Sequence, residues 1–202
     1  MAVAPRTQRV RQSRQESRFR IVTAATELVR QRSYAELSVD AVMREAGIGR
    51  TIFYRHFDDL ADLLMRASRE AVEELFEAQQ SLLEARPGDA TEAVRRALEA
   101  AVEVYGRHGP LLRCMREAAA GDEQVASGYE AMRRRFDELA EQSLREVGGL
   151  GRNGPADLAE TARALNLMNE TYLTDAFGRE PRVAPETAVQ TLTEIWDAVI
   201  RR

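Results

Sequence analysis

The segment from residue 50 to residue 57 carries side chains that suit contacts to a nucleic acid. Arg50, Thr51, Tyr54 and Arg55 offer two guanidinium groups, a hydroxyl and a phenol. Groups of this kind bind phosphates and base edges, so a helix that exposes them could lie in the major groove of DNA. The apolar residues between them would face inward: Ile52, Phe53 and Phe57.

A second short helix must hold this segment in place. Ser38 is a suitable N-cap for a helix that carries Val42 and Ala46, which are small or branched enough for close helix packing. Gly47 can adopt the left-handed backbone that a tight turn needs. A short helix, a glycine turn and a second short helix form the order of a helix-turn-helix, whose first helix lies across the DNA backbone.

In almost every other stretch of the chain, apolar residues recur at helical spacing, and the sequence therefore predicts an all-α fold of about nine helices. We expect three parts: a disordered basic arm over 1–15, the helix-turn-helix DNA-binding domain over 16–60, and a ligand-binding and dimerisation domain over 61–202. The expected helices lie at about 16–32, 38–46, 50–56, 58–82, 91–107, 110–120, 123–147, 156–176 and 185 to the end.

The net charge of −4 is unevenly distributed. Residues 1–60 hold eleven arginines and seven acidic residues, a net charge of +4, whereas the remainder has a net charge of −8. Basic termini are often merely solvated. A basic N-terminal part beside an acidic remainder also suits the binding of an anionic partner by the N-terminal part alone.

Several classes of protein are disfavoured by what the sequence lacks. We find no catalytic motif, no cofactor motif, no metal-ligand cluster, no signal peptide and no apolar run long enough for a membrane span. The single cysteine, Cys114, rules out an internal disulfide and fits a reducing, cytoplasmic location. Cys114 could be a redox sensor, but its apolar neighbours favour a buried small hydrophobe.

The segment from 38 to 60 resembles the TetR family of repressors, with the match extending over about residues 16–65. The similarity rests on Ala46-Gly47 at the turn and on the run Phe53-Tyr54-Arg55-His56-Phe57. It implies that Ser38 and Tyr54 contact phosphates and that Arg50, Thr51 and Arg55 lie at or near base edges. His56 could contact DNA or, as we favour, close the turn by a structural hydrogen bond. The chain departs from the family at Gly49, where serine is usual, and at Leu60, where lysine is usual.

The last 45 residues resemble the ethionamide-resistance repressor subfamily, through Ala164–Glu170, Phe177–Pro181 and Ile195-Trp196. This resemblance implies a long apolar channel in which Asn166 and Asn169 hydrogen-bond a ligand that carries a carbonyl. A spacing of three places both amides on one helix face. The alternative is that the pair bonds across a dimer or to a neighbouring helix.

Other candidate residues of the channel wall follow from the matching helices, although each could equally be plain core. They are Leu98, Tyr105, Tyr129, Met132, Phe136, Leu139, Leu173 and Trp196, with Val94 and Ala101 beside them. Smaller residues than usual at Val94, Ala101 and Thr174 suggest a wider or differently shaped channel.

Together these features predict a ligand-responsive transcriptional regulator, a repressor by family habit, that binds a palindromic operator as a homodimer. A small hydrophobic ligand would release it. We expect the last two helices to pair about a two-fold axis through residues such as Leu158, Phe177, Leu192 and Ile200. The alternatives are a helical enzyme or carrier of apolar molecules on the same fold, and an interaction protein of stacked helices, which would require a repeat that we do not find.

Overall fold

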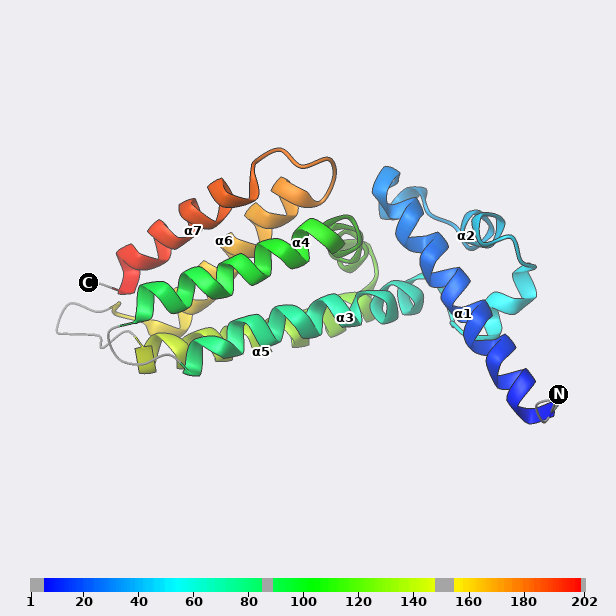
Figure 1. Ribbon diagram of the computed structural model, residues 1–202, viewed down its shortest axis with the longest axis horizontal. Coiled ribbons are helices and arrows are strands. Elements are labelled where there is room, and N and C mark those ends of the chain that lie inside the picture. Colours follow the sequence, from blue (N-terminus) through cyan, green and yellow to red (C-terminus); the bar gives the residue numbers. More distant parts are fainter. Residues whose placement is uncertain (1–5, 85–88, 148–154, 201–202) are drawn as a thin grey trace, which may run out of the picture.

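The computed structural model describes residues 6–84, 89–147 and 155–200, and within these ranges every regular element is helical. Figure 1 shows an elongated molecule, with the N-terminal helices at one end and a bundle of longer helices at the other. The α-helices are α1 (Arg6–Gln31), α2 (Val39–Ala46), α3 (Leu60–Gln80), α4 (Ala90–Gly121), α5 (Glu123–Val147), α6 (Leu158–Phe177) and α7 (Pro185–Ile200). Three 3-10 segments complete them: η1 (Tyr34–Glu36), η2 (Arg50–Arg55) and η3 (Ser81–Glu84). The all-α prediction is confirmed.

The first helix is longer than expected. α1 begins at Arg6, so most of the segment from 1 to 15 that we expected to be disordered continues the helix. The physical reason is local: arginine and glutamine are good helix formers, and neither glycine nor proline interrupts 6–31. Residues 1–5 of the predicted arm lie outside the described ranges.

The two helices expected on either side of Gly109-Pro110 are one helix, α4. Proline removes one helical hydrogen bond and usually bends a helix. The carbonyl deprived of its donor belongs to Gly106, which is exposed, so that water can take the place of the missing N–H. In Figure 1 the first part of α4 lies across the view, whereas its C-terminal part is seen nearly end-on.

Three clusters of buried side chains organise the molecule. The N-terminal cluster packs α1, α2 and η2 around Phe53 and Phe57. The largest cluster fills the bundle of α3 to α7. Between them, Val29 and Leu64 join Leu111 and Cys114 from α4 in a third cluster, which connects the two ends of the molecule. Cys114 is completely buried in this cluster, as its apolar neighbours indicated, and burial raises the pKa of its thiol to about 12.

The side chains expected to face a second subunit are mostly internal. Phe177, Leu192 and Ile200 are 3%, 1% and 9% exposed, and all three belong to the core of the bundle. Leu158 is half-buried against the same core. The apolar residues that the sequence suggested for an intersubunit surface therefore pack in the chain's own core.

Candidate functional site

The turn between α2 and η2 is built around Gly47. Ser38 caps α2, since its Oγ accepts a hydrogen bond from the backbone N–H of Ala41 at 3.1 Å. Gly47 ends the helix with a φ of 64°, in the left-handed region that favours glycine. The guanidinium of Arg20 on α1 donates to the carbonyls of Ala46 and Gly47 from the other side. The predicted cap and turn are confirmed, whereas the role of Arg20 carried no local sequence signal.

The segment after the turn, η2, presents its polar residues to the outside. Arg50, Thr51, Tyr54 and Arg55 are exposed, whereas Phe53 is completely buried. This segment is a 3-10 helix rather than the α-helix expected, and its N-cap, Gly49, supplies no side-chain hydrogen bond. Four of the residues predicted to contact DNA are therefore exposed on the segment that directly follows the turn.

His56 faces α1 rather than the outside. The ring is half-buried, and a hydrogen bond of 2.8 Å joins its Nε2 to Ser17 Oγ. Burial lowers the pKa of His56, and the charges of Arg14, Arg18 and Arg55 act in the same direction. The hydrogen bond to α1 supports the structural interpretation of this residue over a DNA contact.

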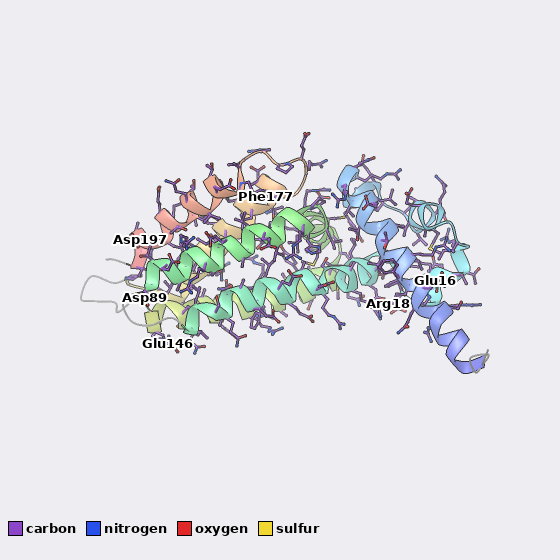
Figure 2. The ribbon with its side chains drawn as sticks, in the orientation of Figure 1. Glu16, Arg18, Asp89, Glu146, Phe177 and Asp197 are labelled. Carbon is purple, nitrogen blue, oxygen red and sulfur yellow. The ribbon has the colours of Figure 1, made fainter. Side chains whose placement is uncertain are left out.

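The charges of the two ends of the molecule differ as the sequence indicates. Figure 2 shows Glu16 and Arg18 on α1 at the N-terminal end, whereas Asp89, Glu146 and Asp197 lie at the opposite end. Arg14 Nη2 donates to the carbonyl of Arg55 at 3.1 Å, which adds a cation beside η2. An anionic partner would therefore be attracted to the end that carries η2.

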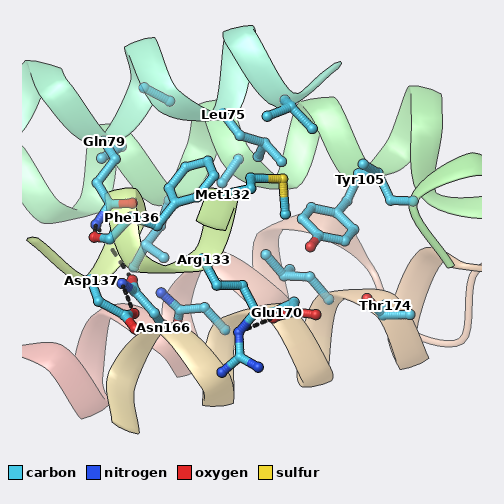
Figure 3. A pocket seen from close by; sticks show the side chains of 18 of the residues that line it. Leu75, Gln79, Tyr105, Met132, Arg133, Phe136, Asp137, Asn166, Glu170 and Thr174 are labelled. Atoms are coloured by element: carbon cyan, nitrogen blue, oxygen red, sulfur yellow. Dashed lines mark hydrogen bonds and ion pairs between the residues drawn. The ribbon is translucent and has the colours of Figure 1, made fainter. Parts of the chain in front are cut away.

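A cavity of about 130 Å³ lies inside the bundle at some distance from η2. The five α-helices from α3 to α7 contribute to its wall together with Leu82 of η3, and Figure 3 shows aromatic, aliphatic and polar side chains pointing into it. The predicted wall residues found there are Val94, Leu98, Ala101, Tyr105, Tyr129, Met132, Phe136, Asn166, Asn169, Leu173, Thr174 and Trp196.

Leu139 is the exception among the predicted wall residues. It is buried at 8% exposure but does not line the cavity. The helical face that α5 turns to the cavity runs instead through Met132, Arg133 and Phe136 to Asp137. Leu139 lies at the edge of that face, because each residue adds 100° around the helix.

The two predicted asparagines already have partners on neighbouring helices. Asn166 donates from Nδ2 to Asp137 Oδ1 at 2.9 Å, and its Oδ1 accepts from Gln79 Nε2 at 3.4 Å. The Oδ1 of Asn169 accepts the indole N–H of Trp196 at 3.2 Å. The neighbouring-helix alternative therefore describes the structure, and both amides nevertheless line the cavity.

Sequence reasoning missed the polar end of the cavity, which Figure 3 shows around Arg133, Asp137 and Glu170. Glu170 accepts a hydrogen bond from Tyr129 Oη and lies 3.6 Å from the Nε of Arg133. Burial raises the pKa of the Tyr129 hydroxyl above its usual value, and the charge of Glu170 raises it further. The wall residues were predicted from the helices that match the ethionamide-resistance repressor subfamily, whereas the spacing of four between Arg133 and Asp137 is the signal that could have revealed this end.

Over the described ranges, the acidic, histidine and cysteine side chains form no group that could hold a metal ion. In the same part of the chain, no helix has the length and apolar character needed to cross a membrane.

Comparison with known proteins agrees with this geometry. Residues 21–67 match the model of the bacterial regulatory proteins of the tetR family, and residues 94–201 match that of the C-terminal domain of transcriptional regulator EthR. The HTH-type transcriptional regulator EthR of Mycobacterium tuberculosis (strain ATCC 25618 / H37Rv) is 30% identical over 202 residues, covering 96% of this chain and 92% of that protein. The EthR of Mycolicibacterium smegmatis is 29% identical over 180 residues, covering 87% of this chain and 82% of its own.

A solved structure shares the fold. The TetR family transcriptional regulator PfmR from Thermus thermophilus superposes with a TM-score of 0.71 at 24% identity, covering 90% of this chain and 97% of that one. The chain belongs to the TetR family of helix-turn-helix transcriptional regulators, and its C-terminal domain is of the EthR type. The relatives are named as regulators of transcription, so the enzyme alternative is not supported.

Proposed function

We propose that the chain is a cytoplasmic repressor that binds a palindromic operator as a homodimer and is released by a small hydrophobic ligand. The observation that carries this proposal is the course of α3. Its first residue, Leu60, packs on the N-terminal cluster, whereas Val72, Leu75 and Gln79 line the cavity. One helix of about 30 Å therefore connects the DNA-binding end to the cavity.

In this proposal residues 16–60 bind DNA. Ser38 and Tyr54 contact phosphates, and Arg50, Thr51 and Arg55 reach base edges. The exposure of all five side chains supports these roles.

The ligand would occupy the cavity with its apolar part among the wall residues and a carbonyl near Asn169. The Oδ1 of this amide is engaged by Trp196, so a carbonyl would accept from its Nδ2 group. Filling the cavity would shift α3 and separate the two DNA-binding ends. The ligand can act in this way only to the extent that it binds the separated state more tightly.

The homodimer would form through the outer faces of the last two helices rather than through their buried residues, such as Phe177 and Leu192. α7 exposes Ile195, which is 38% accessible, and Ala198 lies on the same side one turn later. On α6, Ala164 and Thr171 are exposed at a spacing of seven. Small side chains on both helices allow the close approach that a four-helix interface needs.

The dimer is tested by sedimentation. We expect Ile195→Arg to give a monomer at micromolar concentration and Ala131→Arg, exposed on α5, to leave the dimer intact. A wild-type monomer would reject this part of the proposal.

Operator binding is tested with a duplex selected by the wild-type protein from a random-sequence pool. Binding should weaken steeply as salt increases, since phosphate contacts release counterions. We expect Tyr54→Phe to weaken binding to selected and unselected duplexes alike, because phosphate contacts carry no sequence information. Tyr34→Phe, in η1 and away from the proposed surface, is the control. A chain that selects no duplex at any salt concentration would not be a DNA-binding regulator.

A further inference from the structure

Arg113 is a buried cation that contacts both ends of the molecule. It lies on α4 and is only 7% exposed. Its Nε donates to the carbonyl of Gly178 at 2.8 Å, and its Nη2 donates to the carbonyls of Val29 and Arg32 at 2.7 and 2.8 Å. A buried guanidinium is tolerated only where such partners compensate its lost hydration, so these contacts fix its position.

The acceptors of Arg113 are the C-terminal ends of two helices. Val29 lies in the last turn of α1 and Arg32 directly follows it, whereas Gly178 caps α6. The last carbonyls of a helix lack an intrahelical donor and carry the negative end of its dipole. One cation therefore satisfies α1, from the DNA-binding end, and α6, from the bundle.

Glu117 extends this connection by one helical turn. It forms an ion pair with Arg113 Nη1 and accepts the backbone N–H of Tyr34 at 2.8 Å. Arg113 and Glu117 together therefore bind two carbonyls and one backbone N–H of residues 29–34, where α1 ends. In Figure 1 the end-on part of α4, which carries this pair, lies next to α1.

On the other side, Arg113 is close to the cavity. Leu112 and Met115, beside it on α4, line the cavity, as do Leu173 and Thr174 in the last turn of α6. The carbonyl of Thr174 accepts the N–H of Gly178, so the cavity wall and the acceptor of Arg113 are one turn apart.

The backbones of α4 and α6 also touch at this point. A Cβ atom on Gly109 would lie 2.2 Å from the carbonyl oxygen of Phe177, a distance that no side chain could occupy. This contact lies one turn before Arg113 on α4. Because the two backbones are already in contact here, the end of α6 cannot move toward α4 without displacing the groups around Arg113.

We propose that Arg113 is a positioning residue that couples the cavity to the DNA-binding end, by holding the C-terminal ends of α1 and α6 on one guanidinium. This inference rests on the proposed function and adds to it a second connection beside α3. Contact alone does not demonstrate coupling, so the test must measure a response at one end to an event at the other.

Trp196, the only tryptophan of the chain, lines the cavity and provides that measurement. Because coupling is reciprocal, DNA binding at one end should alter the cavity at the other. We expect the emission of Trp196 in the full-length protein to change when the selected duplex is added. In Arg113→Met the duplex should still bind, within about fivefold of wild type, but the emission change should be reduced, because α3 is then the remaining connection. Arg116→Met, which removes an exposed arginine of α4, should keep the wild-type change.

The outcomes separate coupling from a purely structural role. A structural role would lower the melting temperature of Arg113→Met and leave the emission response to DNA intact, and that result would overturn the inference. A wild-type protein that binds the duplex without any emission change would overturn it as well. Failure to select any duplex would instead reject the proposed function. If circular dichroism shows that Arg113→Met does not fold, Arg113→Lys serves in its place, because a single ammonium keeps the charge but cannot span both helix ends.

Discussion

Asp40 on α2 holds the guanidinium of Arg50 on η2, with Nη1 lying 2.8 and 2.9 Å from the two carboxylate oxygens. The Nη2 of the same arginine donates to Tyr54 Oη at 3.2 Å. The cation that we propose to reach base edges is therefore oriented by two neighbours within the same domain. Both partners of the ion pair are more than half exposed, so it contributes little to stability.

The first prediction concerns base discrimination. We expect Arg50→Ala to reduce discrimination at particular base pairs by about 1–3 kcal/mol wherever the guanidinium makes a good hydrogen-bonded pair with a base. Asp40→Ala should also reduce discrimination, because the guanidinium loses its fixed direction, while affinity for unselected duplexes rises as a negative charge is removed. Glu45→Ala, an exposed carboxylate on the same helix, should raise affinity without this effect on discrimination. Anisotropy titrations with the selected duplex and its single-base variants measure both quantities. Unchanged discrimination in Arg50→Ala would contradict the proposed docking.

The second prediction concerns the turn. Gly47 has a φ of 64°, and a Cβ atom there would lie 3.2 Å from Arg20 Nη2. We expect Gly47→Ala to lower the free energy of unfolding by about 1–2 kcal/mol, the cost of a left-handed residue that has a side chain. Gly49→Ala is the matched control, since its φ is −68° and no atom lies within 4 Å of the added carbon. Urea denaturation of both variants tests the difference. Equal free energies of unfolding would show that position 47 does not require glycine.

The third prediction concerns Asn169. Asn169→Leu removes the acceptor of the indole N–H of Trp196, and Trp196 is only 3% exposed. We expect a decrease of about 1–3 kcal/mol in stability, the usual cost of an unsatisfied buried donor, and an altered Trp196 emission. DNA binding should remain near wild type. In Asn166→Leu the indole hydrogen bond is intact, so its emission should match wild type. A change of emission in Asn166→Leu alone would contradict this arrangement.

The fourth prediction concerns pH. The pKa of His56 in the folded protein lies below its usual 6.5, chiefly because of burial. As the pH falls below about 6.5, the unfolded chain therefore takes up a proton that the folded chain resists, and stability is lost until the pH reaches the folded pKa. Above pH 6.5 this contribution to stability is fully present.

This pH dependence is measured by thermal melting of the wild type and of His56→Gln at about pH 7.5 and about pH 5.5, on either side of the usual histidine pKa. We expect the melting temperature of the wild type to fall more on acidification than that of the variant. His108→Gln, which changes the other histidine of the chain, should behave as the wild type does. An identical fall in wild type and His56→Gln would show that the imidazole is not the group responsible.

The sequence by itself determined the helix-turn-helix, because the signals for it act over a few residues. Ser38 caps the helix that it precedes, Gly47 supplies a backbone conformation that few residues can adopt, and Phe53 and Phe57 follow the helical period into the core. Most of the cavity wall was predicted from the resemblance of the C-terminal segment to the ethionamide-resistance repressor subfamily, with two amides three residues apart on one helix face as local support. The signals for the helix-turn-helix depend on local geometry, which neighbouring residues determine.

Only the tertiary structure decided the contacts that join distant segments. Arg113 bonds to carbonyls more than 80 residues away, and Arg20 supports a turn 26 residues further along the chain. From the sequence, the apolar residues of the last two helices could belong to a dimer interface or to the chain's own core. The structure places Phe177 and Leu192 in the core. An apolar or charged side chain specifies that it needs a partner, whereas which partner it receives depends on how all the helices pack together.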